Sequence, residues 1–308
     1  MSSHSSKRAI VAALFGNLAV AVTKFIAAFL TGSSAMWSEG VHSVVDTGNQ
    51  VLLLIGLERA ARPASEKHPF GHGKEIYFWS FVVAILFFSM GAGVAAYEGW
   101  HRIHAPEPVS DVYINYIVLV VAIVFEGLSW RVAFQEFQRA MHGRSVWATI
   151  RASKDPAVVV VFLEDTAALG GLVLALLGIF LSDVLNMPVL DGWTTLAIAV
   201  LLAATALVLI LETKSLLIGE SASPEVVAGI RALAAKDTRI ASVIEVLTMH
   251  FGPHEVLLNL SLNFQPGLAS GEVERAIADL DRSILSAYPE IRRIFIEAES
   301  VAKAGLTA

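Results

Sequence analysis

The chain has 308 residues, 55% of them hydrophobic, and its mean hydropathy is +0.64, which excludes an ordinary soluble globular protein and is typical of a polytopic membrane protein. The formal net charge of −6 comes without a basic stripe, which argues against binding to nucleic acid. The lack of cysteine excludes disulfides and thiolate metal sites, so any metal ion must be bound by nitrogen and oxygen.

Six apolar runs of about 20 residues, the length needed to cross the hydrocarbon core of a bilayer, occupy the first two thirds of the chain. They predict transmembrane helices at 9–30, 34–57, 76–97, 112–134, 157–181 and 190–211. The polar start of the chain is not followed by a small-residue cleavage pattern, so we expect the first run to be a retained span and not a signal peptide. Residues 1–216 are therefore the predicted membrane domain.

Basic residues predict the orientation of these spans. They gather before the first span, after the second and after the fourth, as Lys7, Arg8, Arg59, Arg62, Lys67, Lys74, Arg139, Arg144, Arg151 and Lys154. The opposite loops carry almost none, with Arg102 as the exception. Because basic loops stay on the cytoplasmic side, we expect both termini to be cytoplasmic in a multi-pass protein of the bacterial inner membrane.

Residues 217–308 are predicted to form a small cytoplasmic domain. Ser223, Pro224 and Glu225 combine a helix N-cap, a first-turn proline and an acidic first turn, which predicts a helix to about residue 235. Strands are predicted at 243–250 and 255–263, a second helix at 272–287 and a closing strand at 294–299. This αββαβ order predicts a ferredoxin-like domain with both helices on one face of a sheet.

Ionisable side chains within the predicted spans are the main candidates for function, because such groups are costly at bilayer depth. His42 and Asp46 are four residues apart and face the same side of a helix, with Glu39 one turn below. Glu164 and Asp165 lie in the fifth span. Since a zinc-type site takes about four donors, the two spans together are predicted to bind one divalent cation. The alternative is that these groups only hydrogen-bond neighbouring helices.

Three further groups of polar residues have a functional and a purely structural interpretation. His68 and His72 could bind a second metal ion, or the rigid turn around them could simply start the next helix. Lys74 and Glu220 are placed to form a charge pair that locks subunits or couples the tail to the spans; the alternative is a snorkelling lysine and a solvated glutamate. Interhelical hydrogen bonds are expected for Asn17, Lys24 and Asn49.

Taken together, these motifs resemble those of the cation diffusion facilitator family of metal exporters. His42 and Asp46 are similar to the first half-site of that family, and Asp165 with the glycine pair that follows it is similar to the second. The most specific local match is the loop sequence HPFGHGK at 68–74. The segment LEDTAA at 163–168 further resembles the branch related to mitochondrial zinc transporters.

The resemblance implies a homodimeric secondary transporter, not an enzyme, that exports a divalent metal ion in exchange for protons and has no resident cofactor. Zn²⁺ is the cargo that the family favours, while an oxygen-rich site also suits Mn²⁺, Fe²⁺ or Co²⁺. Exchange is chemically reasonable because metal ions and protons compete for the same imidazole and carboxylate lone pairs. A proton-coupled exporter of an organic cation is the alternative, although Trp37 is the only indole near the site to line a pocket.

The chain departs from the family pattern in three places. The acidic residue that often precedes the first loop histidine in the family is Ser65 here, which would weaken a metal site at His68 and His72. One turn before Asp165 stands Val161, which cannot bind a metal ion, so Glu164, Glu39 or water must complete the shell. In the tail, the positions that bind metal in zinc-sensing members carry side chains without donor atoms, namely Ile244, Leu260, Ile296 and Ala298. We therefore expect a metal-free tail whose role is dimerisation.

Overall fold

A computed structural model describes residues 3–31, 34–106, 112–141 and 143–299. Within these ranges the side chains of residues 3–6, 27–28, 30–31, 34–42 and 112 are outside the description. The chain divides into two compact units. The helical unit comprises Met1–Ala60 and Glu75–Lys214, and the sheet unit comprises Ala61–Lys74 and Ser215–Ala308.

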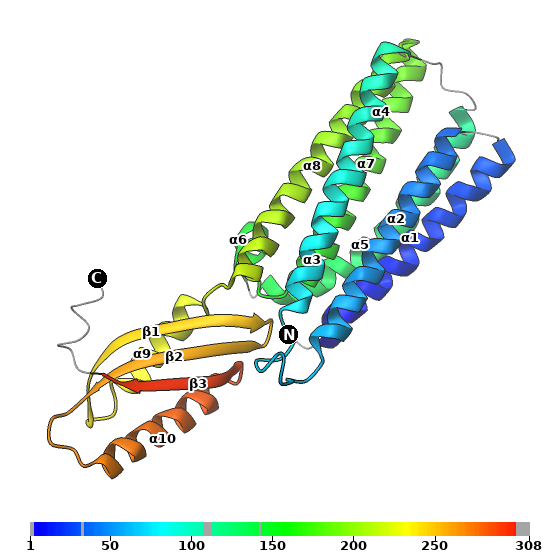
Figure 1. The fold of residues 1–308 in the computed structure, drawn as a ribbon. Helices are drawn as coiled ribbons and strands as arrows, with labels where there is room; N and C mark the ends of the chain where they lie inside the picture. Colours follow the sequence, from blue (N-terminus) through cyan, green and yellow to red (C-terminus); the bar gives the residue numbers. More distant parts are fainter. Residues whose placement is uncertain (1–2, 32–33, 107–111, 142, 300–308) are drawn as a thin grey trace. The chain divides into compact units, whose positions relative to one another are not determined.

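The helical unit consists of long helices that run side by side (Figure 1). Its elements are α1 (Ser3–Thr31), α2 (Ser34–Ala60), α3 (Glu75–Leu86), the π-helix η1 (Phe87–Ala92), α4 (Gly93–His104), α5 (Val112–Met141), α6 (Val146–Ala152), α7 (Pro156–Leu185) and α8 (Val189–Ile218). Among the described residues, five segments are long and apolar enough to cross a membrane: most of α1, the continuous α3–η1–α4 segment, α5, α7 and α8. The α2 helix has 27 residues, and its role as the sixth span stays a prediction.

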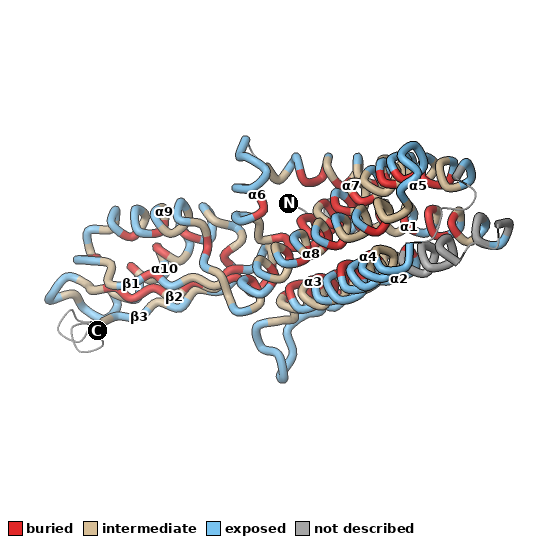
Figure 2. Tube along the Cα trace, turned by 90° about the horizontal axis from the view of Figure 1, so that it is seen from above, coloured by how far each residue is buried: buried red, intermediate tan, exposed pale blue. Residues whose placement is uncertain are grey.

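Each helix of this unit has one side that packs against neighbouring helices and another side that is exposed. The α1 helix packs along α2 and α5, and α5 packs along α7. Buried positions, red in Figure 2, lie between the helices of this unit. Many large apolar side chains point outwards, for example Val200 at 69% and Trp193 at 58% exposure. Lipid is the solvent that suits such a surface, and a helix satisfies its own backbone hydrogen bonds there.

The helix ends differ from the sequence prediction in a consistent way. The fourth predicted span ends at residue 134, but α5 continues to Met141; α7 likewise passes its predicted end at 181 and reaches Leu185. Hydropathy marks where a helix leaves the apolar core, whereas the hydrogen-bonded backbone continues beyond that point. The third span is interrupted by η1, and the short α6 was not predicted.

The sheet unit contains α9 (Pro224–Ala234), β1 (Ile240–Gly252), β2 (Glu255–Phe264), α10 (Ser270–Ala287) and β3 (Ile291–Ala298). The strand order is β1-β2-β3, with β1 and β2 antiparallel and β2 and β3 parallel. The predicted αββαβ order is confirmed, while the closer likeness to a ferredoxin fold stays a prediction. The predicted N-cap is also confirmed, since the Ser223 hydroxyl accepts a hydrogen bond from the Val226 N–H.

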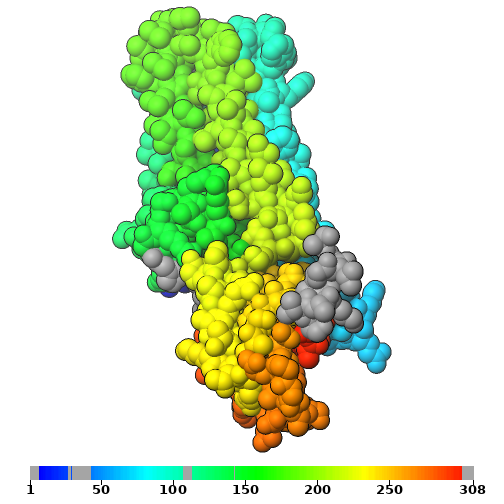
Figure 3. All heavy atoms as spheres, turned by 90° about the vertical axis from the view of Figure 1, so that its left-hand side faces the viewer, coloured from blue at the N-terminus to red at the C-terminus, as the bar shows by residue number. Residues whose placement is uncertain are grey.

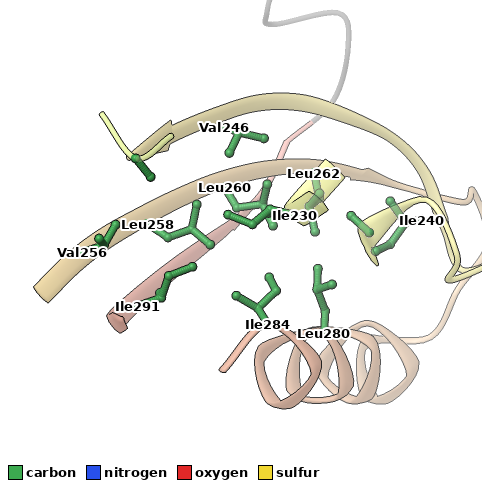
Figure 4. Packing of buried hydrophobic residues seen from close by; sticks show 12 residues of the cluster. Ile230, Ile240, Val246, Val256, Leu258, Leu260, Leu262, Leu280, Ile284 and Ile291 are labelled. Atoms are coloured by element: carbon green, nitrogen blue, oxygen red, sulfur yellow. The ribbon is translucent and has the colours of Figure 1, made fainter. Parts of the chain in front are cut away.

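One apolar core holds this unit together. Alternate residues of β2, Leu258, Leu260 and Leu262, are fully buried on the same face of the sheet. Figure 4 shows Ile284 of α10 pointing into the same core, which Ile230 of α9 also joins. In the space-filling view of Figure 3, α9 (yellow) and α10 (orange) lie next to each other. Both helices therefore cover one face of the sheet, as the sequence predicts.

The segment between α2 and α3 packs within the sheet unit. The Arg293 guanidinium donates a 2.6 Å hydrogen bond to the Pro69 carbonyl, and the ring of Phe70 stacks on Phe251 at 5.1 Å between centroids. A Cβ at Gly73 would lie 2.3 Å from the Phe251 carbonyl oxygen, so only glycine allows this close approach. The loop sequence that resembles the family motif is thus built to contact the tail sheet.

Candidate functional site

A cluster of polar side chains lies inside the apolar helical unit. Its members come from α1 (Lys24), α2 (Ser43, Asp46, Asn49, Gln50), α5 (Glu126, Ser129) and α7 (Glu164, Asp165). Asp46 is half-buried and all the others are buried. Because ionisable groups are rare and costly in membrane-spanning helices, their concentration on four helices marks the candidate functional site.

Glu164 joins α7 to α2. Its Oε1 atom accepts a 3.0 Å hydrogen bond from the Asn49 amide, and its Oε2 atom accepts a 3.0 Å bond from the Gln50 amide. All three residues are buried. The predicted interhelical hydrogen bond of Asn49 is confirmed, and each oxygen of Glu164 already accepts an amide N–H.

Asp165 has a different environment although it is the next residue. The Ser129 hydroxyl donates a 3.0 Å hydrogen bond to Asp165 Oδ2, which connects α5 and α7. The other oxygen, Oδ1, is buried and has no hydrogen-bond partner. Such an orphaned acceptor carries a free-energy cost, which a bound cation would offset. Asp165 therefore offers an oxygen atom that is suited to a cation.

Asp46 brings α2 into the same electrostatic neighbourhood. Its carboxylate interacts with all three buried carboxylates of α5 and α7 in the cluster. The Lys24 ammonium donates a 3.1 Å hydrogen bond to the Ser43 hydroxyl and interacts electrostatically with Glu126. The described part of the cluster thus combines four carboxylates with one lysine.

The remaining predicted ligands are only partly described. His42 and Glu39 lie on α2, but their side chains are outside the described residues. Within the described part of the chain, no three His, Asp or Glu side chains converge closely enough to hold a metal ion. The ligand set of His42, Asp46, Asp165 and Glu164 therefore stays a prediction, although the structure brings Asp46, Glu164 and Asp165 into one cluster.

Sequence reasoning missed Glu126, which is only 3% exposed on α5. The signal was present, because Glu126 is the one acidic residue within the apolar run 112–134. A second buried carboxylate on the same helix, Glu136, is explained by ion pairs with Arg139 at 2.7 Å and Arg8 at 3.8 Å. Glu126 instead belongs to the polar cluster of the candidate site, where it interacts electrostatically with Asp165 and Asp46.

The two loop histidines are neighbours in space. The ring centroids of His68 and His72 are 4.5 Å apart. His72 Nδ1 lies 3.1 Å from the Pro63 carbonyl oxygen, which favours a proton on Nδ1 and leaves Nε2 able to accept a metal ion. The second metal site at this pair stays a prediction.

Lys74 contacts the sheet of its own unit. Its Nζ atom lies 3.7 Å from Met249 Sδ and 5.0 Å from the centroid of the Phe251 ring. The backbone carbonyl of Glu220 accepts a 2.9 Å hydrogen bond from the His250 N–H. These contacts anchor both residues on β1, and the charge pair between Lys74 and Glu220 stays a prediction.

Comparison with known proteins gives the site its context. Residues 10–218 match the model of the cation efflux transmembrane domain. The chain is 30% identical over 243 residues to the mitochondrial proton-coupled zinc antiporter SLC30A9 of Mus musculus, a match that covers 78% of this chain and 43% of that protein. The Xenopus laevis protein of the same name is 32% identical over 243 residues, covering 78% of this chain and 44% of that protein.

A plant protein is also similar. Metal tolerance protein C4 of Arabidopsis thaliana is 28% identical over 261 residues, which covers 84% of this chain and 57% of that protein. The chain thus spans less than half the length of the SLC30A9 relatives and somewhat more than half of the plant protein. Members of the matched family are secondary transporters and not enzymes. This chain is a multi-pass membrane protein that belongs to the cation efflux, or cation diffusion facilitator, family and is related to mitochondrial zinc transporters.

Proposed function

We propose that the protein transports a divalent metal ion, first of all Zn²⁺, across a membrane in exchange for protons. The observation that carries this proposal is the carboxylate cluster of the half-buried Asp46 on α2 and the buried carboxylates on α5 and α7, in which Asp165 keeps one oxygen without a hydrogen bond. In a membrane helix bundle, such a cluster suits a cation that passes through.

The proposed ligands are His42 and Asp46 on α2 and Asp165 on α7. His42 and Asp46 occupy positions one turn apart on the same face of α2. Asp46 interacts electrostatically with Asp165, which supports a shared cation between the two helices. The next donor is a separate question, because Glu164 already accepts hydrogen bonds from two amides.

Proton exchange follows from the charge of the cluster. Four carboxylates and one lysine are a large excess of negative charge in a low-dielectric environment. Such a group must either keep protons or hold a cation, because like charges that are buried together cannot all stay ionised. Metal binding therefore displaces protons, and a site that opens to each side in turn couples the two movements.

Zinc is supported by the ligand chemistry and by the relatives. One imidazole with carboxylates suits Zn²⁺, and the SLC30A9 relatives are named as zinc antiporters. Mn²⁺, Fe²⁺ and Co²⁺ are the alternative cargo, since an oxygen-rich set reduces the preference for softer ions.

The distribution of basic residues supports an orientation with both termini on the cytoplasmic side of a bacterial inner membrane. The tail after residue 216 is proposed to form the homodimer.

Flux into liposomes tests this proposal. Purified protein reconstituted with a zinc-sensitive dye and a pH dye inside should move Zn²⁺ and protons in opposite directions. We expect Asp165→Asn and Asp46→Asn to abolish both movements. Asp183→Asn, at an exposed position of α7, is the matched control and should transport like the wild type.

Two outcomes would contradict the proposal. A wild-type protein that moves no divalent ion would reject the transport function. Unchanged zinc flux in both the Asp46 and the Asp165 variants, with the folded protein verified by gel filtration, would reject the assigned site.

A further inference from the structure

We propose that Glu126 on α5 is a direct ligand of the transported metal ion, so that a third helix completes the site, and that Glu164 positions the helices instead. This inference rests on the proposed function and names a residue of the same site. It supplies the metal ligand that is missing at Val161, which lies one turn before Asp165 and has no donor atom.

The first argument concerns Glu164, the other candidate for the missing ligand. Its two oxygens accept 3.0 Å hydrogen bonds from Asn49 and Gln50, which are 1% and 0% exposed. If Glu164 turned towards a metal ion, two buried amide groups would lose their acceptor. Because an unsatisfied buried donor costs more than its hydrogen bond contributes, this arrangement resists ligation by Glu164.

The second argument concerns the position of Glu126. It lies three residues before Ser129, so both side chains share one face of α5. The Ser129 hydroxyl is bonded to Asp165 Oδ2, which places this face of α5 against the proposed metal ligand of α7. Glu126 also interacts electrostatically with Asp165 and Asp46. The carboxylate is therefore buried beside the two proposed acidic ligands.

The third argument is the unsatisfied oxygen of Asp165. Oδ1 is buried and without a hydrogen bond, while Oδ2 is held by Ser129. A cation at Oδ1 would satisfy this oxygen, and His42, Asp46, Asp165 and Glu126 would then supply the four donors that a tetrahedral site needs. Among the described residues these carboxylates do not converge closely enough to hold a metal ion, so the proposed site requires their side chains to move together when the ion binds. Mutual repulsion of the carboxylates is a physical reason for their separation without a cation.

Zinc binding to the purified full-length protein separates the roles of the glutamates. By isothermal titration calorimetry, Glu126→Gln should weaken Zn²⁺ binding by at least about 100-fold, because losing a direct ligand costs more than losing a supporting residue. Glu164→Gln should weaken it by only about 10-fold. Glu136→Gln is the matched control, since this buried carboxylate of α5 pairs with Arg139 and lies outside the cluster. It should bind Zn²⁺ like the wild type.

A second measurement avoids any dependence on the folding of a variant. In the wild-type protein loaded with Zn²⁺, anomalous scattering should place the ion about 2.0–2.2 Å from a carboxylate oxygen of Glu126. An ion bound to Asp165 and Glu164 but beyond coordinating distance from Glu126 would overturn the inference. Wild-type affinity in Glu126→Gln would overturn it as well.

The proposed function and this inference fail in different ways. If Asp165→Asn abolishes zinc binding while Glu126→Gln binds normally, the transport site stands and only the role of Glu126 is wrong. If the wild-type protein binds no divalent ion, both fail together.

Discussion

At the scale of single residues, neighbours in sequence acquire different chemistry from the helices they face. Glu164 is held by two amides of α2, whereas Asp165 has one oxygen on the Ser129 hydroxyl and the other without a hydrogen bond. The sequence predicts both carboxylates as site residues because they interrupt an apolar run. It does not distinguish their roles, because these depend on donors more than 30 residues away in the chain.

Ser129→Ala tests the support that α5 gives to Asp165. The change removes the hydroxyl that donates to Oδ2 and leaves a small side chain in place. We expect zinc affinity to fall by about 10–100-fold, as for other residues that orient a metal ligand. Titration calorimetry measures this effect. Ser89→Ala is the control, because the Ser89 hydroxyl bonds only to carbonyls of its own helical segment, and it should leave the affinity unchanged.

A charge network in the sheet unit predicts a pH effect on its stability. Hydrogen bonds from the Arg239 guanidinium hold the pKa values of Asp237 and Asp279 below their ordinary value. Because a lowered pKa in the folded state favours folding while the carboxylates are ionised, this contribution is present above about pH 4 and is lost as the pH falls through the folded pKa values.

Arg239→Gln should therefore reduce the protection of β1 and β2 from hydrogen exchange at neutral pH. The difference from the wild type should shrink below about pH 4, where the aspartates become protonated. Hydrogen exchange with mass spectrometry, corrected for intrinsic rates, measures both effects. The control is Arg275→Gln, whose guanidinium bonds to the Gly271 carbonyl of its own helix. A pH-independent difference for Arg239→Gln would contradict the prediction.

At the scale of elements, the close approach of α1 and α5 supports the site. A Cβ at Gly16 of α1 would lie 2.8 Å from the Ser129 Cβ, so the two helices meet at this position without room for a methyl group. The residue that holds Asp165 is thus itself held by helix packing. The hydropathy of the sequence predicts both helices, but it does not indicate that Gly16 of α1 packs against Ser129 of α5.

Gly16→Ala should destabilise the helical unit by about 1–3 kcal/mol, because overpacking forces neighbouring side chains to move. It should also weaken zinc binding through Ser129. Gly127→Ala on α5 is the matched control, since no atom lies within 4 Å of the place that a Cβ would take there. Unfolding in a denaturant series, followed by tryptophan fluorescence, compares the two variants. Equal stability of Gly16→Ala and the wild type would contradict the packing argument.

At the scale of the whole molecule, the sheet unit gathers residues that are distant in the sequence. The Ala61–Lys74 segment lies between the helices α2 and α3 in the sequence, yet it forms one compact unit with the tail. Arg293 of β3 bonds to the Pro69 carbonyl and its guanidinium lies 5.2 Å from the centroid of the Phe70 ring. The loop at 68–74, whose sequence resembles the family motif, therefore packs against β3 whether or not its histidines bind a metal ion.

Arg293→Ala should release this loop. Losing the hydrogen bond to Pro69 costs roughly 1 kcal/mol, which corresponds to about fivefold faster hydrogen exchange at residues 66–74. Arg292→Ala, the adjacent residue of β3, is the control and should leave the exchange rates unchanged. Equal rates for both variants would show that the stacking of Phe70 on Phe251 alone holds the loop.

By itself, the sequence determined the membrane helices of α1, α3–η1–α4, α5, α7 and α8, the αββαβ order of the tail and the candidate carboxylates of α7. These features depend on local chemistry: the length of an apolar run, the alternation along a strand, a capping serine, or a charge where none is expected. Their signals are contained in short stretches of the chain.

Only the tertiary structure decided that Glu126 joins the cluster and that Glu164 accepts hydrogen bonds from two amides. It also decided that Asp165 keeps an oxygen without a hydrogen bond and that the loop after α2 packs on the tail sheet. Each of these features depends on which faces of distant helices and strands meet. That choice follows from the packing of the complete chain, because hydrogen-bond partners and close contacts between elements are not encoded in any one segment.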